Sequence, residues 1–358
     1  MRVATIVGAR PQFIKVAPVS KALCEAGIQE VLIHTGQHFD ADMSDIFFQE
    51  LGIRAPDHHL AIHGGGHGAM TGTMLQKLEP LLEDVKPDRV LIYGDTNSTL
   101  AGALTAAKLH IPVAHVEAGL RSFNRAMPEE INRIVADQLS DLLFSSTDTA
   151  TANLKREGVE EARIHQVGDV MYDAALQFAE RARQQKVLER FGVEPQRYVL
   201  ATIHRAENTD DLTRLRIIVE ALEEIAETLP VLLPLHPRTA GRMTKLGLGF
   251  SRVRTTTPLG YLDMIGLEAR AAVIATDSGG VQKEAFFCRV PCVTLRDETE
   301  WVELVDLGWN RLAPPANGGV AQAVLQAIGT RGLPGTPYGD GGSAQAIARI
   351  IAAHLSSR

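Results

Sequence analysis

Short apolar runs alternate with longer stretches of helical spacing along most of the chain. The runs are too short for helices and are followed by glycine or polar residues, so we interpret them as buried strands. The longer stretches repeat apolar residues at the spacing of amphipathic helices. This alternation predicts an α/β fold built from βαβ units with parallel strands and right-handed crossovers. The predicted strands are 2–7, 31–35, 89–93, 111–116, 142–145, 166–167, 198–203, 231–235, 272–276 and 291–295, and the predicted helices include 70–85, 98–109, 149–157, 212–228, 258–269 and 344–355.

Two successive βα series follow one another without an all-β block between them. The length of 358 residues exceeds that of one ordinary domain, so two domains are expected. Residues 168–195 have little strand character, and we place the domain boundary near residue 170. The prediction is two Rossmann-like domains facing each other, 1–170 and 171–340, and a C-terminal segment, 341–358, that carries the amphipathic helix 344–355.

Composition and charge narrow the possible functions. The net charge is −7 at pH 7 and no segment is a basic block, so we expect no nucleic-acid partner. The overall charge does not exclude a local cationic pocket. The chain has no signal-peptide profile and no apolar run long enough to span a bilayer, so we expect a cytoplasmic protein with no membrane partner. The sparse cysteines, Cys24, Cys288 and Cys292, are predicted to be buried thiols.

Three acidic residues are predicted to meet at one edge of the first sheet. Asp95 and Glu117 follow strands 89–93 and 111–116, and ligands of open α/β folds bind at the carboxyl ends of the strands. Glu129 follows Pro128 at a predicted helix start. Converging carboxylates are costly unless they transfer protons or bind a cation. The sequence leaves three roles open for these acidic residues. They could bind magnesium, transfer protons, or cap helices and pair with nearby arginines. Capping suits Glu129 best.

A predicted anion site lies where the first strand meets the first helix. Gly8 permits a tight turn, and Arg10 and Lys15 flank a helix start whose amides are unpaired. The alternative is an ordinary surface arginine and lysine. The glycine triplet of the dinucleotide fingerprint is missing, so this turn does not predict a nicotinamide site.

The second domain has a glycine-containing helix start of its own. Small residues let a phosphate approach helix amides, and two glycines are more than a helix cap needs. A carboxylate farther along that helix is placed to accept hydrogen bonds from a ribose diol. The residues concerned are Ser278, Gly279, Gly280 and Glu284.

Two histidines at the ends of neighbouring strands add to a local cationic patch. His204 and Arg205 follow strand 198–203, and His236 follows strand 231–235 with Arg238 beside it. A diphosphate fits such a patch. An isolated histidine is more often structural, but the paired placement at the functional edge favours ligand contact.

Taken together, several motifs resemble those of the non-hydrolysing UDP-N-acetylglucosamine 2-epimerases, over nearly the whole chain. The motifs, in order, are GARPQFIK, GDTNST, HVEAGLRS, MPEEINR, HRAEN and TDSGGVQKEA. The resemblance implies two Rossmann-like domains of the glycosyltransferase-B type, an active site between them, and a C-terminal helix that packs back on the first domain. The residue roles it implies are catalysis by Asp95, Glu117 and Glu129, catalysis or phosphate contact by His204, and UDP binding by Arg10, His236, Ser278 and Glu284.

The chain departs from the commonest family pattern at two positions. Gln12 stands where many members have glutamate. Phe39 stands where regulated bacterial members have an arginine that helps to bind an activating second UDP-sugar, so such activation is not implied here. The segments SFNRAMPEE, HGGGHGAMTG and DETEWVELVDLGWN are more similar to a branch that acts on UDP-2,3-diacetamido-2,3-dideoxy-glucuronate.

The implied reaction inverts C2 of a UDP-2-acetamido sugar through elimination of UDP and its re-addition to a 2-acetamidoglycal. It needs acid–base groups on both faces of the sugar and a cationic clamp for the departing diphosphate. It needs no nicotinamide, metal or other cofactor, and the histidines around the glycine-rich segment 64–66 match no zinc spacing. The alternatives are a glycosyltransferase of the same fold and a non-catalytic nucleotide-sugar sensor. We expect a UDP-sugar as the small-molecule partner and a homodimer as the assembly.

A uronate substrate requires a partner for its carboxylate. Arg121 and Arg125 lie just after Glu117 in the sequence, on the expected sugar side, and segment 64–68 offers room for a second acetamide. Either arginine can instead pair with Glu129 or Glu130. A bidentate arginine–carboxylate contact is worth about 1.5–3 kcal/mol, enough for a tenfold preference.

Overall fold

The computed structural model describes residues 1–37 and 50–356, so the departure at Phe39 lies outside the described residues. The chain forms two compact units. Unit 1 comprises Met1–Gln177 and Thr336–Arg358, and unit 2 comprises Phe178–Gly335. The boundary between them falls inside one helix, α7 (Val170–Gln184), in the region where the sequence predicts no strand.

In the described part of unit 1, the strands form one parallel sheet in the order β3-β2-β1-β4-β5-β6-β7. The strand order reverses between β1 and β4, as in doubly wound folds, and ligands of such folds bind outside the carboxyl ends at this reversal. Glycine and polar residues at those carboxyl ends are therefore candidates for the site. The strands are β1 (Arg2–Val7), β2 (Gln29–His34), β3 (His58–His59), β4 (Arg89–Tyr93), β5 (Val113–Ala118), β6 (Leu142–Ser145) and β7 (Ile164–Gln166).

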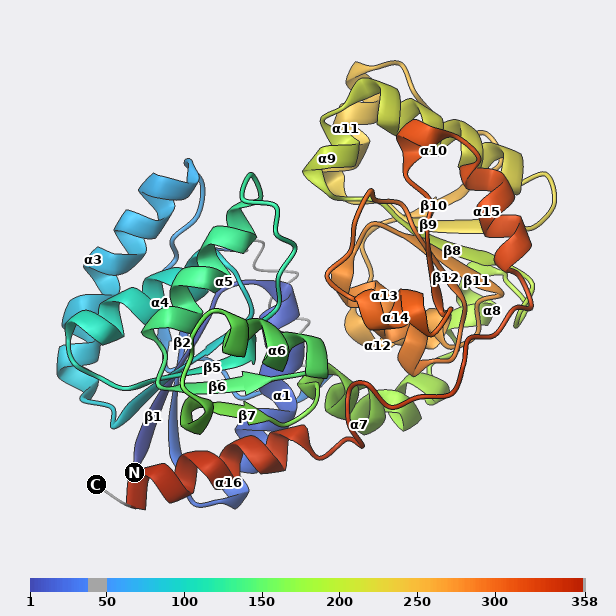
Figure 1. Cartoon of the computed structure of the whole chain (residues 1–358). Coiled ribbons are helices and arrows are strands. Elements are labelled where there is room, and N and C mark those ends of the chain that lie inside the picture. The colour runs from blue at the N-terminus through green and yellow to red at the C-terminus, as the bar shows by residue number, and fades with distance from the viewer. Residues whose placement is uncertain (38–49, 357–358) are drawn as a thin grey trace. The chain divides into compact units, whose positions relative to one another are not determined.

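Helices cover both faces of this sheet (Figure 1). Alternate strand residues such as Ala4 and Ile6 pack against Met74, Leu78 and Ala101 in one core beneath α3 and α4. The C-terminal helix α16 packs against α1, so the predicted return of that helix to the first unit is confirmed. The helices of this unit are α1 (Arg10–Glu25), α3 (His67–Val85), α4 (Asn97–Lys108), α5 (Pro128–Leu139), α6 (Asp148–Arg156) and α16 (Ser343–Ser356).

Unit 2 repeats the pattern with a parallel sheet in the order β10-β9-β8-β11-β12-β13, and its order reverses between β8 and β11. The inner strands β8, β11 and β12 are buried along their whole length, as expected for a parallel sheet covered on both faces, whereas β10 and β13 at the two edges are mostly exposed. Val199 and Ala201 belong to one core, while Tyr198 and Leu200 belong to the other. The strands are β8 (Val199–Thr202), β9 (Val231–Pro234), β10 (Arg254–Thr256), β11 (Val273–Thr276), β12 (Cys292–Thr294) and β13 (Asn310–Leu312), and the helices are α8 (Val187–Phe191), α9 (Ala206–Thr209), α10 (Leu212–Ile225), α11 (Pro237–Lys245), α12 (Tyr261–Glu268), α13 (Gly279–Phe287), α14 (Val302–Asp306) and α15 (Val320–Ala327).

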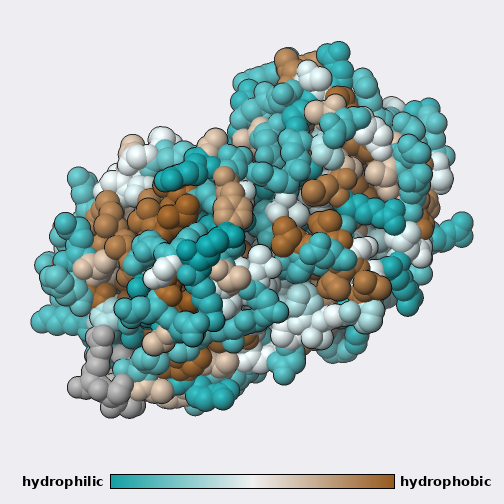
Figure 2. Space-filling model, in the orientation of Figure 1, coloured by the Kyte–Doolittle hydropathy of each residue, from teal (hydrophilic) through white to brown (hydrophobic). Residues whose placement is uncertain are grey.

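The surface and the cysteines complete the description. Hydrophilic residues cover most of the face shown in Figure 2, with hydrophobic residues between them. No described helix is long and apolar enough to cross a membrane. The prediction that all cysteines are buried is wrong for Cys24, which is exposed near the end of α1, and Cys288 is only half-buried. Cys292 is buried, and its burial raises the pKa of its thiol to about 12.

Candidate active site

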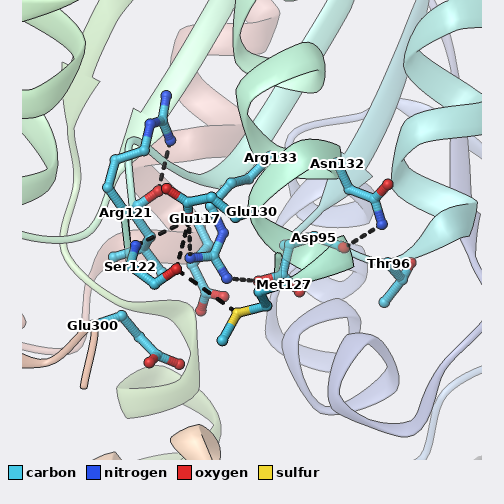
Figure 3. Close-up of polar contacts among 12 residues, drawn as sticks. Asp95, Thr96, Glu117, Arg121, Ser122, Met127, Glu130, Asn132, Arg133 and Glu300 are labelled. Atoms are coloured by element: carbon cyan, nitrogen blue, oxygen red, sulfur yellow. Dashed lines mark hydrogen bonds and ion pairs between the residues drawn. The ribbon is translucent and has the colours of Figure 1, made fainter. Parts of the chain in front are cut away.

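Asp95 lies in the turn that connects β4 to α4, at the reversal of strand order in unit 1. Gly94 takes a left-handed conformation with φ of 61°, and Thr96 accepts a hydrogen bond from the Thr99 amide to cap α4. Arg133 of α5 pairs with the Asp95 carboxylate, as Figure 3 shows. The Asp95 side chain keeps 28% of its surface exposed, so it is held in place but stays reachable.

Glu117 lies at a bulge in β5, beside the Asp95 turn. The register of β5 with β6 shifts between Val116 and Ala118, and Glu117 has φ of 70°, which costs a residue other than glycine about 1–3 kcal/mol. Lys15 Nζ lies 2.5 Å from Glu117 Oε1, and both side chains are almost fully buried. A Cβ atom on Gly94 would lie 3.6 Å from Glu117 Oε1 and 3.2 Å from Lys15 Nζ. The bulge therefore carries the Glu117 carboxylate to the turn that bears Asp95.

Glu129 stands in the first turn of α5 and is half-buried. Within the described residues its carboxylate makes no hydrogen bond or ion pair. Its neighbour Glu130 is buried and accepts hydrogen bonds from Ser122 N at 2.9 Å and Phe123 N at 3.0 Å, while Arg133 Nη1 lies 3.0 Å from it. Glu130 thus holds the loop before α5 and pairs with Arg133, whereas the sequence suggested it only as a possible partner of Arg121 or Arg125.

The structure contradicts the expected sugar contact of Arg121. Its side chain is 1% exposed and donates to both carboxylate oxygens of Glu157, at 2.7 and 2.6 Å, while Nη2 lies 2.8 Å from Asp137 Oδ2. The alternative pairing with Glu129 or Glu130 is also wrong for this residue. Arg125 is exposed on the loop before α5. No local sequence pattern predicts which residues pair with Arg121, because Asp137 and Glu157 lie on two different segments later in the chain.

Gln12 occupies the predicted anion site at the start of α1. Its Oε1 accepts hydrogen bonds from Gly8 N at 2.8 Å and Ala9 N at 3.0 Å. Its Nε2 donates to Tyr93 O at 2.8 Å, which ties the β1 turn to the end of β4. These amides are already paired, and Arg10 stands beside them at the first helical position. In the sequence, Gln12 stands out only as a departure from a family glutamate.

The glycine-rich segment of unit 1 adjoins the same turn. His67 begins α3, and its Nδ1 lies 3.3 Å from Asn97 Oδ1 at the start of α4. A hollow of about 250 Å³ lies between the loop before α3 and the first turns of that helix. Its lining residues are Ala61, Ile62, His63, Gly64, Ala69, Met70, Thr73 and Lys77. In the part of the chain that the structure describes, no group of histidine, cysteine, aspartate and glutamate is placed to hold a metal.

Asp277 organises the corresponding edge of unit 2. It follows β11, is fully buried, and accepts hydrogen bonds from His204 N at 3.1 Å and Arg205 N at 3.0 Å after β8. Asn208 Nδ2 donates to the same carboxylate at 3.1 Å. The His204 ring stays 46% exposed, with Nδ1 3.3 Å from Asp277 Oδ1. Asp277 therefore fixes the loop that presents His204.

Gly279 at the start of α13 lies close to two side chains of the segment after β12. Ser278 caps the helix by accepting from Val281 N at 3.5 Å. A Cβ atom on Gly279 would lie 2.8 Å from Glu300 Oε1 and 3.3 Å from Trp301 Nε1. The packing of these two side chains favours glycine at 279, and the phosphate contact inferred from the sequence stays a prediction. Gly280, the next residue, lies in the first turn of the same helix.

Glu284 and His236 are the other predicted ligands of unit 2. Glu284 is buried on α13 near Glu268 of α12, and burial together with the Glu284 charge raises the pKa of Glu268 well above its ordinary value. His236 is exposed and caps α11, where its Nδ1 accepts from Arg238 N at 3.2 Å.

The chain is similar over its length to known proteins. The family model described as UDP-N-acetylglucosamine 2-epimerase matches residues 21–352. The chain is 55% identical to the UDP-2,3-diacetamido-2,3-dideoxy-D-glucuronate 2-epimerase of Pseudomonas aeruginosa, over 98% of this chain and 99% of that protein. It is 43% identical to the UDP-N-acetylglucosamine 2-epimerase of Methanocaldococcus jannaschii, over 98% and 99%.

Solved structures give the same result for the fold. The structure of the M. jannaschii enzyme in complex with UDP-GlcNAc and UDP superposes with a TM-score of 0.93 at 43% identity, over 98% of this chain and 99% of that one. The enzyme from Neisseria meningitidis bound to UDP-GlcNAc gives a TM-score of 0.90 at 30% identity, over 98% and 99%. The predicted pair of Rossmann-like units of the glycosyltransferase-B type is confirmed.

Proposed function

Because the chain belongs to the UDP-N-acetylglucosamine 2-epimerase family, we propose that it inverts C2 of a UDP-2-acetamido sugar by eliminating and re-adding UDP. The observation that carries the proposal is the placement of Asp95 and Glu117. Two carboxylates on adjacent strand ends, one of them on a strained bulge, stand at the reversal of strand order. Glu129 in the first turn of α5 supplies the third carboxylate.

The chemistry explains why several carboxylates are needed. The C2 hydrogen is not beside a carbonyl, so it becomes acidic only as the C1–O bond to UDP breaks. One carboxylate removes the C2 proton while the bonding pair of C1–O leaves with UDP, and a 2-acetamidoglycal results. A carboxylic acid then delivers a proton to the opposite face of C2, and the UDP oxygen re-forms the bond to C1. We assign these transfers to Asp95, Glu117 and Glu129.

Cationic and donor groups stabilise the diphosphate as it departs. We assign this role to Arg10 of unit 1 and to His204, Arg205 and the start of α13 in unit 2, with His236 beside them. Glu284 is proposed to receive the ribose hydroxyls. Lys15 contributes through its ion pair with Glu117, at 2.5 Å, rather than as a phosphate ligand.

We propose UDP-2,3-diacetamido-2,3-dideoxy-glucuronate as the sugar that this chain prefers. The support is the P. aeruginosa relative named for that sugar, at 55% identity. With Arg121 engaged in buried ion pairs, Arg125 is the remaining arginine of the RSFNR segment for the uronate carboxylate. The hollow beside the glycine-rich segment supports this choice, because it offers room for the second acetamide.

The experiment incubates the protein in deuterated water with one UDP-sugar and no acceptor, and follows C2 by NMR. We expect deuterium at C2 and the C2 epimer, with a higher kcat/KM for the diacetamido-glucuronate than for UDP-N-acetylglucosamine. The Glu129→Gln variant, which disturbs no hydrogen bond within the described residues, is the inactive control. Transfer that requires an acceptor would instead indicate a glycosyltransferase, and absence of any change would indicate a sensor.

The proposed enzyme works in the cytoplasm as a homodimer, as the sequence predicted. Light scattering on the purified protein tests the assembly. A monomeric mass at micromolar concentration would contradict the homodimer and leave the reaction untouched.

A further inference from the structure

Unit 1 connects four ionisable side chains, three of them buried, in one contiguous network. His115 of β5 and Asp137 of α5 are fully buried, and the Arg121 side chain is 1% exposed. Glu157, just after α6, closes the network with 27% exposure. We call these four residues the buried charge network. None of them is among the residues to which the proposed function gives a chemical role.

Hydrogen bonds connect the members of the network. His115 Nε2 lies 2.7 Å from Gly94 O, and His115 Nδ1 lies 2.7 Å from Asp137 Oδ1. A carbonyl oxygen only accepts, so Nε2 donates to Gly94 O, and Nδ1 forms the bond to the Asp137 carboxylate. Arg121 pairs with both Asp137 and Glu157. Buried polar and charged groups are tolerated when they are hydrogen-bonded and paired in this way.

The ionised state of Asp137 follows from its surroundings. Burial by itself would raise the pKa of Asp137, but the hydrogen bond and charge of His115, and the charge of Arg121, lower that pKa below its ordinary value. The Asp137 carboxylate also accepts from Gly119 N at 3.1 Å, and Arg121 Nη2 lies 2.8 Å from its Oδ2. Three donors from the short stretch 115–121 thus converge on one carboxylate.

The two ends of the network bond to the two segments that carry the candidate acids. Gly94, whose carbonyl His115 binds, directly precedes Asp95. Gly119, whose amide Asp137 binds, follows Glu117 by two residues. Both glycines and Glu117 have positive φ, at 61°, 85° and 70°, so these backbones are held away from the ordinary strand conformation. A hydrogen-bonded bridge of two side chains connects them.

We propose that His115 and Asp137 are positioning residues that fix the separation of the Asp95 and Glu117 carboxylates for proton transfer at C2. This inference rests on the proposed function. Neither side chain touches the substrate in this assignment. They act through Gly94 and Gly119, in addition to the direct contacts of Arg133 with Asp95 and of Lys15 with Glu117. A displacement of 1 Å at a reacting group can cost about a hundredfold in rate, so such a bridge affects kcat.

A matched pair of substitutions separates the two bonds of the imidazole. In His115→Gln the amide nitrogen takes the place of Nε2, so the donor to Gly94 O is kept and the donor to Asp137 is lost. In His115→Asn the amide nitrogen takes the place of Nδ1, so the bond to Asp137 is kept and the bond that holds the Asp95 turn is lost. His110→Asn, at an exposed position with φ of 58° that asparagine tolerates, is the control.

The measurements are kcat and KM for C2 epimerisation, the dissociation constant for UDP, and the folded fraction by circular dichroism. We expect kcat per folded molecule to fall about a hundredfold in His115→Asn and about tenfold in His115→Gln, with KM and the UDP dissociation constant within about twofold of the unsubstituted protein. His110→Asn should match the unsubstituted protein. Asp137→Asn, which cannot accept from all three donors, should also lower kcat.

The outcomes decide between positioning and bulk stability. If His115→Asn and Asp137→Asn lower only the folded fraction and leave kcat per folded molecule within threefold, the network is structural and the proposal is overturned. If His115→Asn does not fold, the comparison of His115→Gln with Asp137→Asn decides on the same criterion. Failure of the unsubstituted protein to exchange C2 would overturn the proposed function, which is a separate result.

Discussion

The ion pair between Lys15 and Glu117 allows a catalytic role and a structural role to be measured separately. The two side chains are 7% and 8% exposed, with 2.5 Å between Nζ and Oε1. Glu117→Gln preserves shape but leaves the Lys15 ammonium buried without its counter-charge. Breaking a buried pair from one side costs about 3–5 kcal/mol, a large share of the 5–15 kcal/mol by which domains are stable. We therefore expect this variant to be markedly less stable at pH 7.

The double variant Lys15→Met with Glu117→Gln removes both charges. Because no uncompensated charge remains, it should recover most of the lost free energy of unfolding. The rate of C2 exchange should be at least about a hundredfold lower than in the unsubstituted protein in both variants, because neither has the Glu117 carboxylate. Lys21→Met on the same helix is the matched control, because the Lys21 side chain is 63% exposed and its Nζ lies 3.9 Å from Glu25 Oε1. This exposed pair should contribute under about 0.5 kcal/mol.

Urea unfolding followed by circular dichroism gives the stabilities, and NMR in deuterated water gives the exchange rates. A double variant as unstable as the single variant would show that the unpaired ammonium is not the cause of the loss. Near-normal exchange in either variant would refute the acid–base role of Glu117, whatever the stabilities are.

Three further predictions follow from other contacts. Gln12→Glu removes the donor to Tyr93 O, so the free energy of unfolding should fall by about 1–3 kcal/mol at pH 7, and the loss should shrink at acid pH as the new carboxyl gains a proton; urea unfolding at two pH values checks this. Desolvation would raise the pKa of Glu223, but the amides and the hydroxyl of the 251–253 segment lower it to about 2. The contribution of Glu223 to the free energy of unfolding is therefore complete above its unfolded pKa of about 4 and is lost as the pH falls towards 2. Glu223→Gln should flatten that part of the curve of stability against pH. Arg10→Ala should weaken UDP binding in calorimetry and weaken uridine binding far less, whereas equal effects would place Arg10 away from the diphosphate.

The sequence alone determined the fold class and brought Asp95 and Glu117 of the candidate site to one edge of the sheet. Strands β4 and β6 begin and end at the predicted residues, because both are apolar runs buried on both faces and bounded by polar residues or glycine. The carboxyl ends of parallel strands meet by geometry, so the order of residues is enough to place Asp95 and Glu117 at one edge. The short strands β3, β10 and β13 were not predicted, because two or three mostly exposed residues carry no hydrophobic period.

Only the tertiary structure decided which charged side chains face one another. Lys15 and Glu117 are 102 residues apart, and His204 and Asp277 are 73 apart, so no local pattern records either pairing. Arg121 could be assigned to the sugar from its place in the sequence, yet its guanidinium turns to Asp137 and Glu157. Backbone periodicity follows from the order of residues along the chain, whereas a hydrogen bond or ion pair depends on the positions of two side chains that folding brings together.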